Sequence, residues 1–146
     1  MQINHAEIAR LIPHAGKMCL LDSVSEWDAV KIKCRSRSHL MQDNPLRTDG
    51  QLSALCGIEY AAQAMAVHGG LTGLTDRLPR AGYLASLRDV VCRRSRLDDM
   101  EGDLIVEAEQ LMADETRVIY QFAVRVGAIE ILSGRAAVVL DVGIST

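Results

Sequence analysis

Apolar residues are most concentrated in one central segment of the chain, from Leu52 to Val67. It is rich in Ala, Leu and Met, and apart from the Tyr60 hydroxyl its clearly polar side chains are Ser53, Glu59 and Gln63. These residue types favour a helix, and the His-Gly-Gly at 68–70 is typical of a helix C-terminus, where a histidine can interact with the helix dipole. A helix that is apolar on nearly all sides should be buried on most of them. Because the segment is shorter than a bilayer span, we predict a helix enclosed by the rest of the protein.

Alternation of polar and apolar residues predicts strands before and after this helix. At 30–37, small or apolar residues at the even positions alternate with Lys and Arg at the odd ones, as in a half-buried strand. Asp114-Glu115 and Gly127 predict tight turns that join the last three strands in an antiparallel meander. The six predicted strands are Met18–Trp27, Val30–Arg37, Tyr83–Cys92, Asp103–Met112, Thr116–Val126 and Ala128–Leu140.

Two further segments complete the predicted order of elements. A short helix at His5–Leu11 would begin with Asn4 as its N-cap and end before Pro13. The polar segment His39–Gly50 is predicted to be a loop whose final Thr-Asp-Gly leads to the N-cap of the long helix. Strands and helices do not alternate along the chain. We therefore predict the α+β class, with a curved antiparallel sheet of about six strands around one long central helix, in a single domain at 1–146.

Composition and charge exclude several classes of function. The chain has 146 residues, a net charge of -3, and only one Trp, one Phe and three Tyr. A nucleic-acid-binding protein would need a basic surface or aromatic rings for base stacking, so we expect no nucleic-acid partner. No apolar run of 18 residues and no signal segment is visible, so we expect a cytoplasmic protein with no membrane partner. The four cysteines form no C-x-x-C pair, which predicts no metal site, and nothing indicates another cofactor.

Glu59 is the residue of the long helix that most needs an explanation. An ionised carboxylate is costly to bury, and burial without a partner would raise its pKa. One interpretation is a general acid or base kept near neutral pH by burial. The other is that Glu59 faces a gap filled by solvent or pairs with an arginine. Gln63, one helical turn later, could orient this carboxylate or satisfy a different neighbouring group.

Two motifs resemble those of the 3-hydroxyacyl-acyl-carrier-protein dehydratases. The residues Ile-Pro-His at 12–14 and Met-Cys-Leu-Leu-Asp-Ser-Val at 18–24 resemble the family's L-P-H…L-L-x-D-R-V opening. The segment Gly57–Gln63 resembles its G-x-L-x-x-E-A-x-A-Q helix. The longer string NPLRTDGQLSALCGIEYAAQAMAVHGGL is similar to the dehydratase-like subgroup of aryl polyene biosynthesis clusters. The resemblance implies the hotdog fold, in which an antiparallel sheet wraps one long helix.

The resemblance also implies an active site shared between two subunits. In that family a loop histidine of one subunit removes the α-proton of a 3-hydroxyacyl thioester carried by an acyl carrier protein. A helix glutamate of the other subunit helps the hydroxyl leave, and Glu59 stands at its position. Gln63 stands at the position of a supporting residue, and Gly50 or Gln51 at that of the N–H donor to the thioester carbonyl. His14 belongs to the family's P-H motif and is counted with the substrate-binding residues.

The family's histidine motif is where this sequence departs from the pattern. Counted back from Glu59, the motif falls at Asn44-Pro45-Leu46, and no histidine lies between His39 and Glu59. An asparagine can hydrogen-bond but cannot take a proton at neutral pH. Three explanations stay open: His39 or His14 substitutes as the base, Glu59 works alone, or the chain is not catalytic by itself. The alternatives to a dehydratase are a hotdog acyl thioesterase, which Glu59 with Asn44 could serve, and a non-catalytic acyl-binding subunit of a heteromeric dehydratase.

Charge is distributed unevenly in the second half of the chain. Residues 77–96 contain six arginines and one aspartate, whereas residues 97–115 contain eight acidic residues and no lysine or arginine. The arginines could attract an acidic acyl carrier protein, or the two segments could neutralise each other on neighbouring strands. The basic row Lys31, Lys33, Arg35 and Arg37 is a second possible patch for such a partner, or a strand face exposed to solvent. A sheet edge left uncovered in so small a protein predicts a homodimer or higher homo-oligomer, or a heteromer with a related dehydratase.

Overall fold

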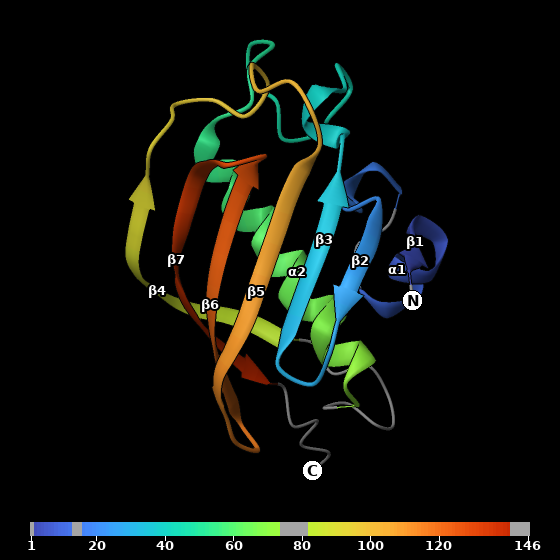
Figure 1. Cartoon of the computed structure of the whole chain (residues 1–146), viewed down its shortest axis with the longest axis vertical. Coiled ribbons are helices and arrows are strands. Elements are labelled where there is room, and N and C mark those ends of the chain that lie inside the picture. Colours follow the sequence, from blue (N-terminus) through green and yellow to red (C-terminus); the bar gives the residue numbers. More distant parts are fainter. Residues whose placement is uncertain (1, 13–15, 74–81, 141–146) are drawn as a thin grey trace.

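An antiparallel sheet curves around one long helix, α2, in a computed structural model that describes residues 2–12, 16–73 and 82–140 (Figure 1). This is the α+β hotdog arrangement that the resemblance implies, and the predicted fold class is confirmed. The elements, in chain order, are β1 (Ile3–Asn4), α1 (His5–Leu11), η1 (Gly16–Met18), β2 (Ser23–Trp27), β3 (Lys31–Ser36), η2 (Ser38–Leu40), η3 (Ala54–Cys56), α2 (Gly57–Leu71), β4 (Gly82–Cys92), β5 (Leu104–Ala113), β6 (Arg117–Val126) and β7 (Ile129–Leu140).

Among the described residues the sheet has seven strands in the order β1-β2-β3-β5-β6-β7-β4, and every neighbouring pair is antiparallel. The meander β5-β6-β7 was predicted, but the estimate of about six strands was one too few. The missed strand is β1, whose two residues pair with Val24 and Ser23 of β2 and are too short to show any periodicity. Asn4 then caps α1 as predicted: its side chain accepts from the N–H of Glu7 at 2.9 Å, and its own N–H donates to the Glu7 carboxylate at 3.2 Å.

The predicted limits of the long helix, Leu52–Val67, were wrong at both ends. Asp49 and Gly50 have positive φ angles and form a two-residue hairpin turn rather than an N-cap. Ser53 supplies a cap instead, because its hydroxyl accepts from the N–H of Leu55 and starts η3 ahead of α2. At the other end α2 continues through Gly70, where a Cβ atom would lie 3.2 Å from the Leu11 side chain. This glycine allows close packing against α1 rather than ending the helix.

The core lies between α2 and the sheet, and α2 packs mainly against β3, β5 and β6. Gly57 begins the helix with no room for a side chain, since a Cβ atom there would lie 2.9 Å from Leu132 of β7. The few aromatic residues are used efficiently: Tyr60, Tyr120 and Phe122 are the largest side chains that are fully buried. No described helix has the length and apolar character needed to cross a membrane.

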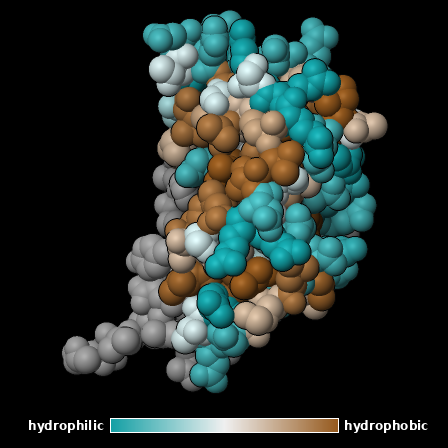
Figure 2. All heavy atoms as spheres, turned by 90° about the vertical axis from the view of Figure 1, so that its left-hand side faces the viewer, coloured by the Kyte–Doolittle hydropathy of each residue, from teal (hydrophilic) through white to brown (hydrophobic). Residues whose placement is uncertain are grey.

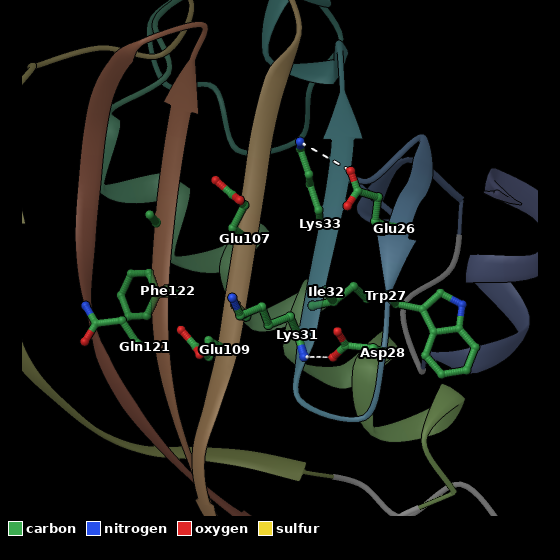
Figure 3. A pocket seen from close by; sticks show the side chains of 12 residues that line it. Glu26, Trp27, Asp28, Lys31, Ile32, Lys33, Glu107, Glu109, Gln121 and Phe122 are labelled. Atoms are coloured by element: carbon green, nitrogen blue, oxygen red, sulfur yellow. Dashed lines mark hydrogen bonds and ion pairs between the residues drawn. The ribbon is translucent and has the colours of Figure 1, made fainter. Parts of the chain in front are cut away.

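The basic row at 31–37 lies on the outer face of the sheet and is neutralised there by β5 and the residue before it. Lys31 stands opposite Glu109 and Lys33 opposite Glu107 in the strand register, and Arg35 and Arg37 both reach Asp103, at 3.2 and 2.8 Å. One pocket on this face is lined by Trp27 and by charged side chains of β3 and β5, among them Lys31, Lys33, Glu107 and Glu109 (Figure 3). It contains none of the predicted site residues. Cross-strand pairing therefore accounts for this row without a partner.

His68 is buried inside the protein, so a role in stabilising the helix dipole at the surface was the wrong interpretation. One ring nitrogen, Nε2, donates to the Asp28 carbonyl at 2.9 Å, and Nδ1 then accepts from the Tyr120 hydroxyl at 2.8 Å. The two bonds join α2 to β6 and to the turn between β2 and β3. Burial lowers the pKa of His68 below the ordinary value for histidine, which keeps the ring neutral.

We expect folding stability to fall between about pH 7 and pH 5, because burial lowers the pKa of both His39 and His68. The unfolded chain binds protons near pH 6.5 and the folded chain does not, so stability is complete above this pH and is lost below it. Each histidine contributes a limiting slope of about 1.4 kcal/mol per pH unit to the free energy of unfolding. Urea unfolding at pH 7.5, 6.5 and 5.5 should show a smaller pH slope of the unfolding free energy for His68→Gln than for the wild type. Equal slopes in wild type and His68→Gln would contradict this assignment.

Candidate functional site

Glu59 lies in the first turn of α2, and its side chain is exposed in the single chain, whereas burial was one expectation from the sequence. Three other incompletely buried residues share its side of the helix at spacings of three and four: Leu55, Ala62 and Ala66. We call these four residues the open stripe. The sheet of the same chain covers the opposite side of α2, so the open stripe is the part of an otherwise apolar helix that this chain leaves uncovered.

Beside the open stripe, one edge of the sheet is also uncovered on its helix side. β4 is the edge strand, and its Leu84 and Leu87 stand opposite Val138 and Ala136 of β7, on the face that carries the core. Leu84, Leu87 and Val90 are each 37 to 41% exposed. Figure 2 views this side of the molecule, where hydrophobic residues gather along the middle and polar ones interrupt them. Because Gly57 rests against Leu132 of β7, which pairs with Cys92, the first turn of α2 lies towards the Cys92 end of β4.

Asn44 lies beside the helix, next to the residue that follows Glu59. Its amide nitrogen donates to the Tyr60 hydroxyl at 3.0 Å and to the Ser38 carbonyl at 2.9 Å, and its oxygen accepts from the N–H of Leu46 at 2.9 Å. The residue is 6% exposed. The loop therefore holds Asn44 against Tyr60, and in the single chain the Asn44 amide is occupied in fastening the loop to α2.

Tyr60 is the anchor that the sequence reasoning missed. Its hydroxyl meets the Ser38 hydroxyl at 2.7 Å as well as Asn44, and the ring is fully buried. Burial raises the pKa of Tyr60, so the phenol stays protonated. The sequence did contain a signal for this role: Tyr60 is a tyrosine in an otherwise apolar helix, and a buried tyrosine needs a hydrogen-bond partner for its O–H.

The structure describes His39, one of the two histidines considered as the base, but not His14. The His39 ring is fully buried, and its Nε2 meets the Met100 carbonyl at 2.9 Å, on the connection between β4 and β5. Burial lowers its pKa, and its Nδ1 has no partner among the described residues. No hydrogen bond or ion pair joins His39 to Glu59 in the described part of the chain. His14 lies outside the described residues.

Gln63 is fully buried and satisfies backbone groups rather than the Glu59 carboxylate. Its oxygen accepts from the N–H of Leu20 at 2.8 Å, and its nitrogen donates to the Met18 carbonyl at 2.6 Å. These bonds also explain why the strand predicted from Met18 begins only at Ser23: the backbone at 18–20 bonds with the helix instead of a neighbouring strand.

Gly50 and Gln51 lie in the hairpin before α2. The N–H of Gln51 donates to the Thr48 carbonyl at 3.0 Å, whereas the N–H of Gly50 has no acceptor within the described residues. Of the two candidates for polarising a thioester, Gly50 thus has the available N–H. No three metal-binding side chains come together in the described ranges. What these residues offer chemically is one exposed carboxylate on α2 and one backbone N–H in the hairpin before it, while the described histidine of the loop, His39, is buried.

Comparison with protein families gives a match over residues 6–141 to the ApeP-like family, described as ApeP dehydratase. The match covers nearly the whole chain, and the chain belongs to this family. This agrees with the resemblance found from the motifs. A comparison with curated proteins finds no match.

Solved structures share the fold at low sequence identity. A chain of the dehydratase heterocomplex ApeI:P from Xenorhabdus doucetiae matches with a TM-score of 0.81 and 22% identity, over 93% of this chain and 91% of that one. A thioesterase from Haemophilus influenzae matches with a TM-score of 0.66 and 12% identity, over 98% and 94% of the two chains. The PaaI protein of E. coli, from the phenylacetic acid degradation operon, gives 0.64 and 10%, over 92% and 88%. At these identities the likeness shows the hotdog fold.

We predict that Gln63→Leu lowers the free energy of unfolding by about 1–3 kcal/mol, because it leaves the Leu20 N–H and the Met18 carbonyl without their partner. Urea unfolding measures the loss. The matched control is Gln121→Leu on the exposed outer face of β6, which should change stability by about 0.5 kcal/mol or less. Wild-type stability in Gln63→Leu would instead favour a role with substrate.

Proposed function

We propose that this member of the ApeP-like family is a subunit of a dehydratase that removes water from a 3-hydroxyacyl thioester carried by an acyl carrier protein. Glu59 is the acid/base group that it contributes. The observation that carries the proposal is the position of Glu59, which is a carboxylate on an uncovered stripe of an otherwise apolar helix and has no ion-pair partner among the described residues.

The reaction requires two proton transfers. A base removes the α-proton, the electron pair of that C–H bond forms the C=C bond, and the C–O bond at the β-carbon breaks. An acid then protonates the leaving hydroxyl, which departs as water. Glu59 can serve as the acid when protonated. Asn44 cannot take the α-proton, and the buried His39 is bonded to the β4–β5 connection. The second group must come from elsewhere, and we place it on a companion chain.

Two features support a companion chain at the open stripe. The edge strand β4 presents unpaired backbone groups and the apolar side chains Leu84, Leu87 and Val90, an arrangement that a second sheet edge can cover. The same companion would lie over Glu59 and enclose it. A homodimer would bring a second Asn44 and no loop histidine, so we propose a related hotdog chain that carries a base. The ApeI:P match is to a chain of a two-component dehydratase, which supports this choice.

Replacing Glu59 tests the proposed chemistry. The affinity-tagged chain, purified from its own host with the chains that stay bound, should convert a 3-hydroxyacyl carrier protein to the enoyl product. Glu59→Gln keeps the size of the side chain and removes its proton transfer, so the rate should fall by about 10²–10⁴-fold. Mass spectrometry of the carrier-bound acyl group measures the conversion. Glu109→Gln, on the outer face of β5, is the control and should keep the wild-type rate.

Three results would overturn the proposal. An undiminished rate in Glu59→Gln would remove Glu59 from the chemistry. Free carrier thiol without enoyl product would show a thioesterase instead, while neither product from the wild-type complex would leave an acyl-binding subunit.

Replacing Leu87 tests the proposed interface. A lysine in place of Leu87 would put a charge on the uncovered face beside β4 and should prevent a second chain from covering it. Sedimentation velocity should show the wild-type chain in an assembly and Leu87→Lys as a single 16.0 kDa chain. Leu111→Lys is the control, because Leu111 is even more exposed, at 49%, but lies near the end of β5 away from β4. Equal association of both variants would contradict the interface.

A further inference from the structure

The carboxylate of Asp98 is buried at the end of the molecule where the loops meet. Asp98 lies on the connection between β4 and β5, and its side chain is 5% exposed. It accepts from the Leu52 N–H at 2.9 Å and from two nitrogens of Arg96, and an Arg47 nitrogen lies 3.9 Å away. The Arg96 hydrogen bonds hold the pKa of Asp98 well below its usual range, so the group is charged at neutral pH. A buried carboxylate that accepts hydrogen bonds from Leu52 and Arg96 and lies within ion-pair distance of Arg47 constrains all three residues.

Arg47 closes the loop that contains Asn44 and Gly50. Its side chain is 12% exposed and donates to three backbone carbonyls: those of His39 at 3.2 Å, Met41 at 2.9 Å and Gly50 at 2.7 Å. One guanidinium thus joins the beginning and the end of the loop, since its fork of N–H groups can reach several acceptors at once. Asp98 balances the charge of Arg47 within the protein.

The start of α2 is joined to the same place. The Leu97 N–H donates to the Leu52 carbonyl at 2.9 Å, and the Ala54 N–H donates to the Ser95 carbonyl at 3.0 Å. With the bond from Leu52 to Asp98, these contacts tie Leu52 and the first residue of η3, Ala54, to the chain that leaves β4. In Figure 1 the loop, the start of the helix and this connection lie together above the sheet. Glu59 lies in the first turn of α2, directly after η3, so its position depends on these contacts.

A second aspartate shows that pairing with two arginines does not by itself link separate segments of the chain. Asp103 also pairs with two arginines, Arg35 and Arg37, but its side chain is 38% exposed, and these ion pairs reach only strand β3 and the residue after it. Burial of a charged pair is weak evidence for stability, because desolvation offsets much of the attraction. Asp98 therefore differs from Asp103 in the segments that it connects, which are the loop held by Arg47 and the start of α2.

We propose that Asp98 is a positioning residue for the Glu59 site: with Arg47 it fixes the loop at 39–52 and the entry to α2 in the geometry that the reaction needs. The inference rests on the proposed function and adds a residue that no motif indicates. It contacts no reacting atom and acts through the loop and the helix. A displacement of about 1 Å in such a site can cost about 100-fold in rate.

The test compares Asp98→Asn with Asp103→Asn in the complex purified from the host. An asparagine in place of Asp98 keeps the shape and an acceptor for Leu52 but removes the charge that Arg96 and Arg47 face. Below the unfolding transition of both variants, kcat for Asp98→Asn should fall about 10–100-fold while KM changes by about threefold or less. Asp103→Asn should keep the wild-type kcat. A merely structural role would reduce the folded fraction and leave kcat per folded molecule unchanged.

Amide hydrogen exchange supplies a readout that does not depend on activity. Asp98→Asn should increase exchange at residues 39–59, whereas Asp103→Asn should leave that segment at the wild-type rate. Arg47→Gln should increase exchange in the same segment. The double variant Arg47→Gln/Asp98→Asn should lose less protection from exchange than the sum of the losses in the two single variants.

Unchanged exchange at 39–59, or equal kcat in the two aspartate variants, would overturn the proposal. If the wild-type complex makes no enoyl product, the proposed function fails on its own assay, and the role of Asp98 in that reaction fails with it. The exchange measurement then still decides whether Asp98 orders the loop.

Discussion

The burial of α2 is the constraint on which the rest of the structure depends. The helix is apolar over most of its surface, but the sheet of its own chain covers it mainly from β3, β5 and β6. The open stripe and the helix side of β4 are left over, and both are apolar apart from Glu59. Exposed apolar area on this scale favours association. Glu59 therefore lies where a second chain that covered the apolar surface would also enclose its carboxylate.

The polar residues of α2 divide into two groups by how they are satisfied. Tyr60, Gln63 and His68 are fully buried, and each holds a different segment: the loop at 38–44, the backbone at 18–20, and the turn after β2 together with Tyr120. Every buried hydroxyl, amide and ring nitrogen among them has a partner, as the cost of leaving such groups unpaired demands. Glu59 alone is exposed and unpaired within the described residues. This contrast in burial and pairing, more than polarity, is what makes Glu59 the candidate functional residue of α2.

Local patterns predicted what depends on local periodicity, and long-range contacts determined the rest. Alternation identified β3, β6 and the meander, and the Ala-rich segment identified α2. The start of the helix was placed five residues early because its limit is set by contacts with residues 95–98, which no pattern at 48–57 contains. The burial of Glu59 was overestimated for a related reason, since hydropathy shows that a helix needs cover but not which chain provides it. Asp98 and Arg47, 51 residues apart, carry no joint signal.

Asn44 holds the loop in place through hydrogen bonds and is not free to act on a substrate. A proton-accepting group must be free to meet substrate, whereas the Asn44 amide is used on both sides, by Tyr60 and Ser38 and by Leu46. Its neighbour Arg47 binds the same loop through three carbonyls, so the loop is held by groups that do not titrate at neutral pH. On the proposed function, two different chains would then form unequal sites: one would combine Glu59 with the base of the companion, and the other would contain Asn44. Under that arrangement the carboxylate and the base belong to different chains, so a substitution at one of them leaves the other in place.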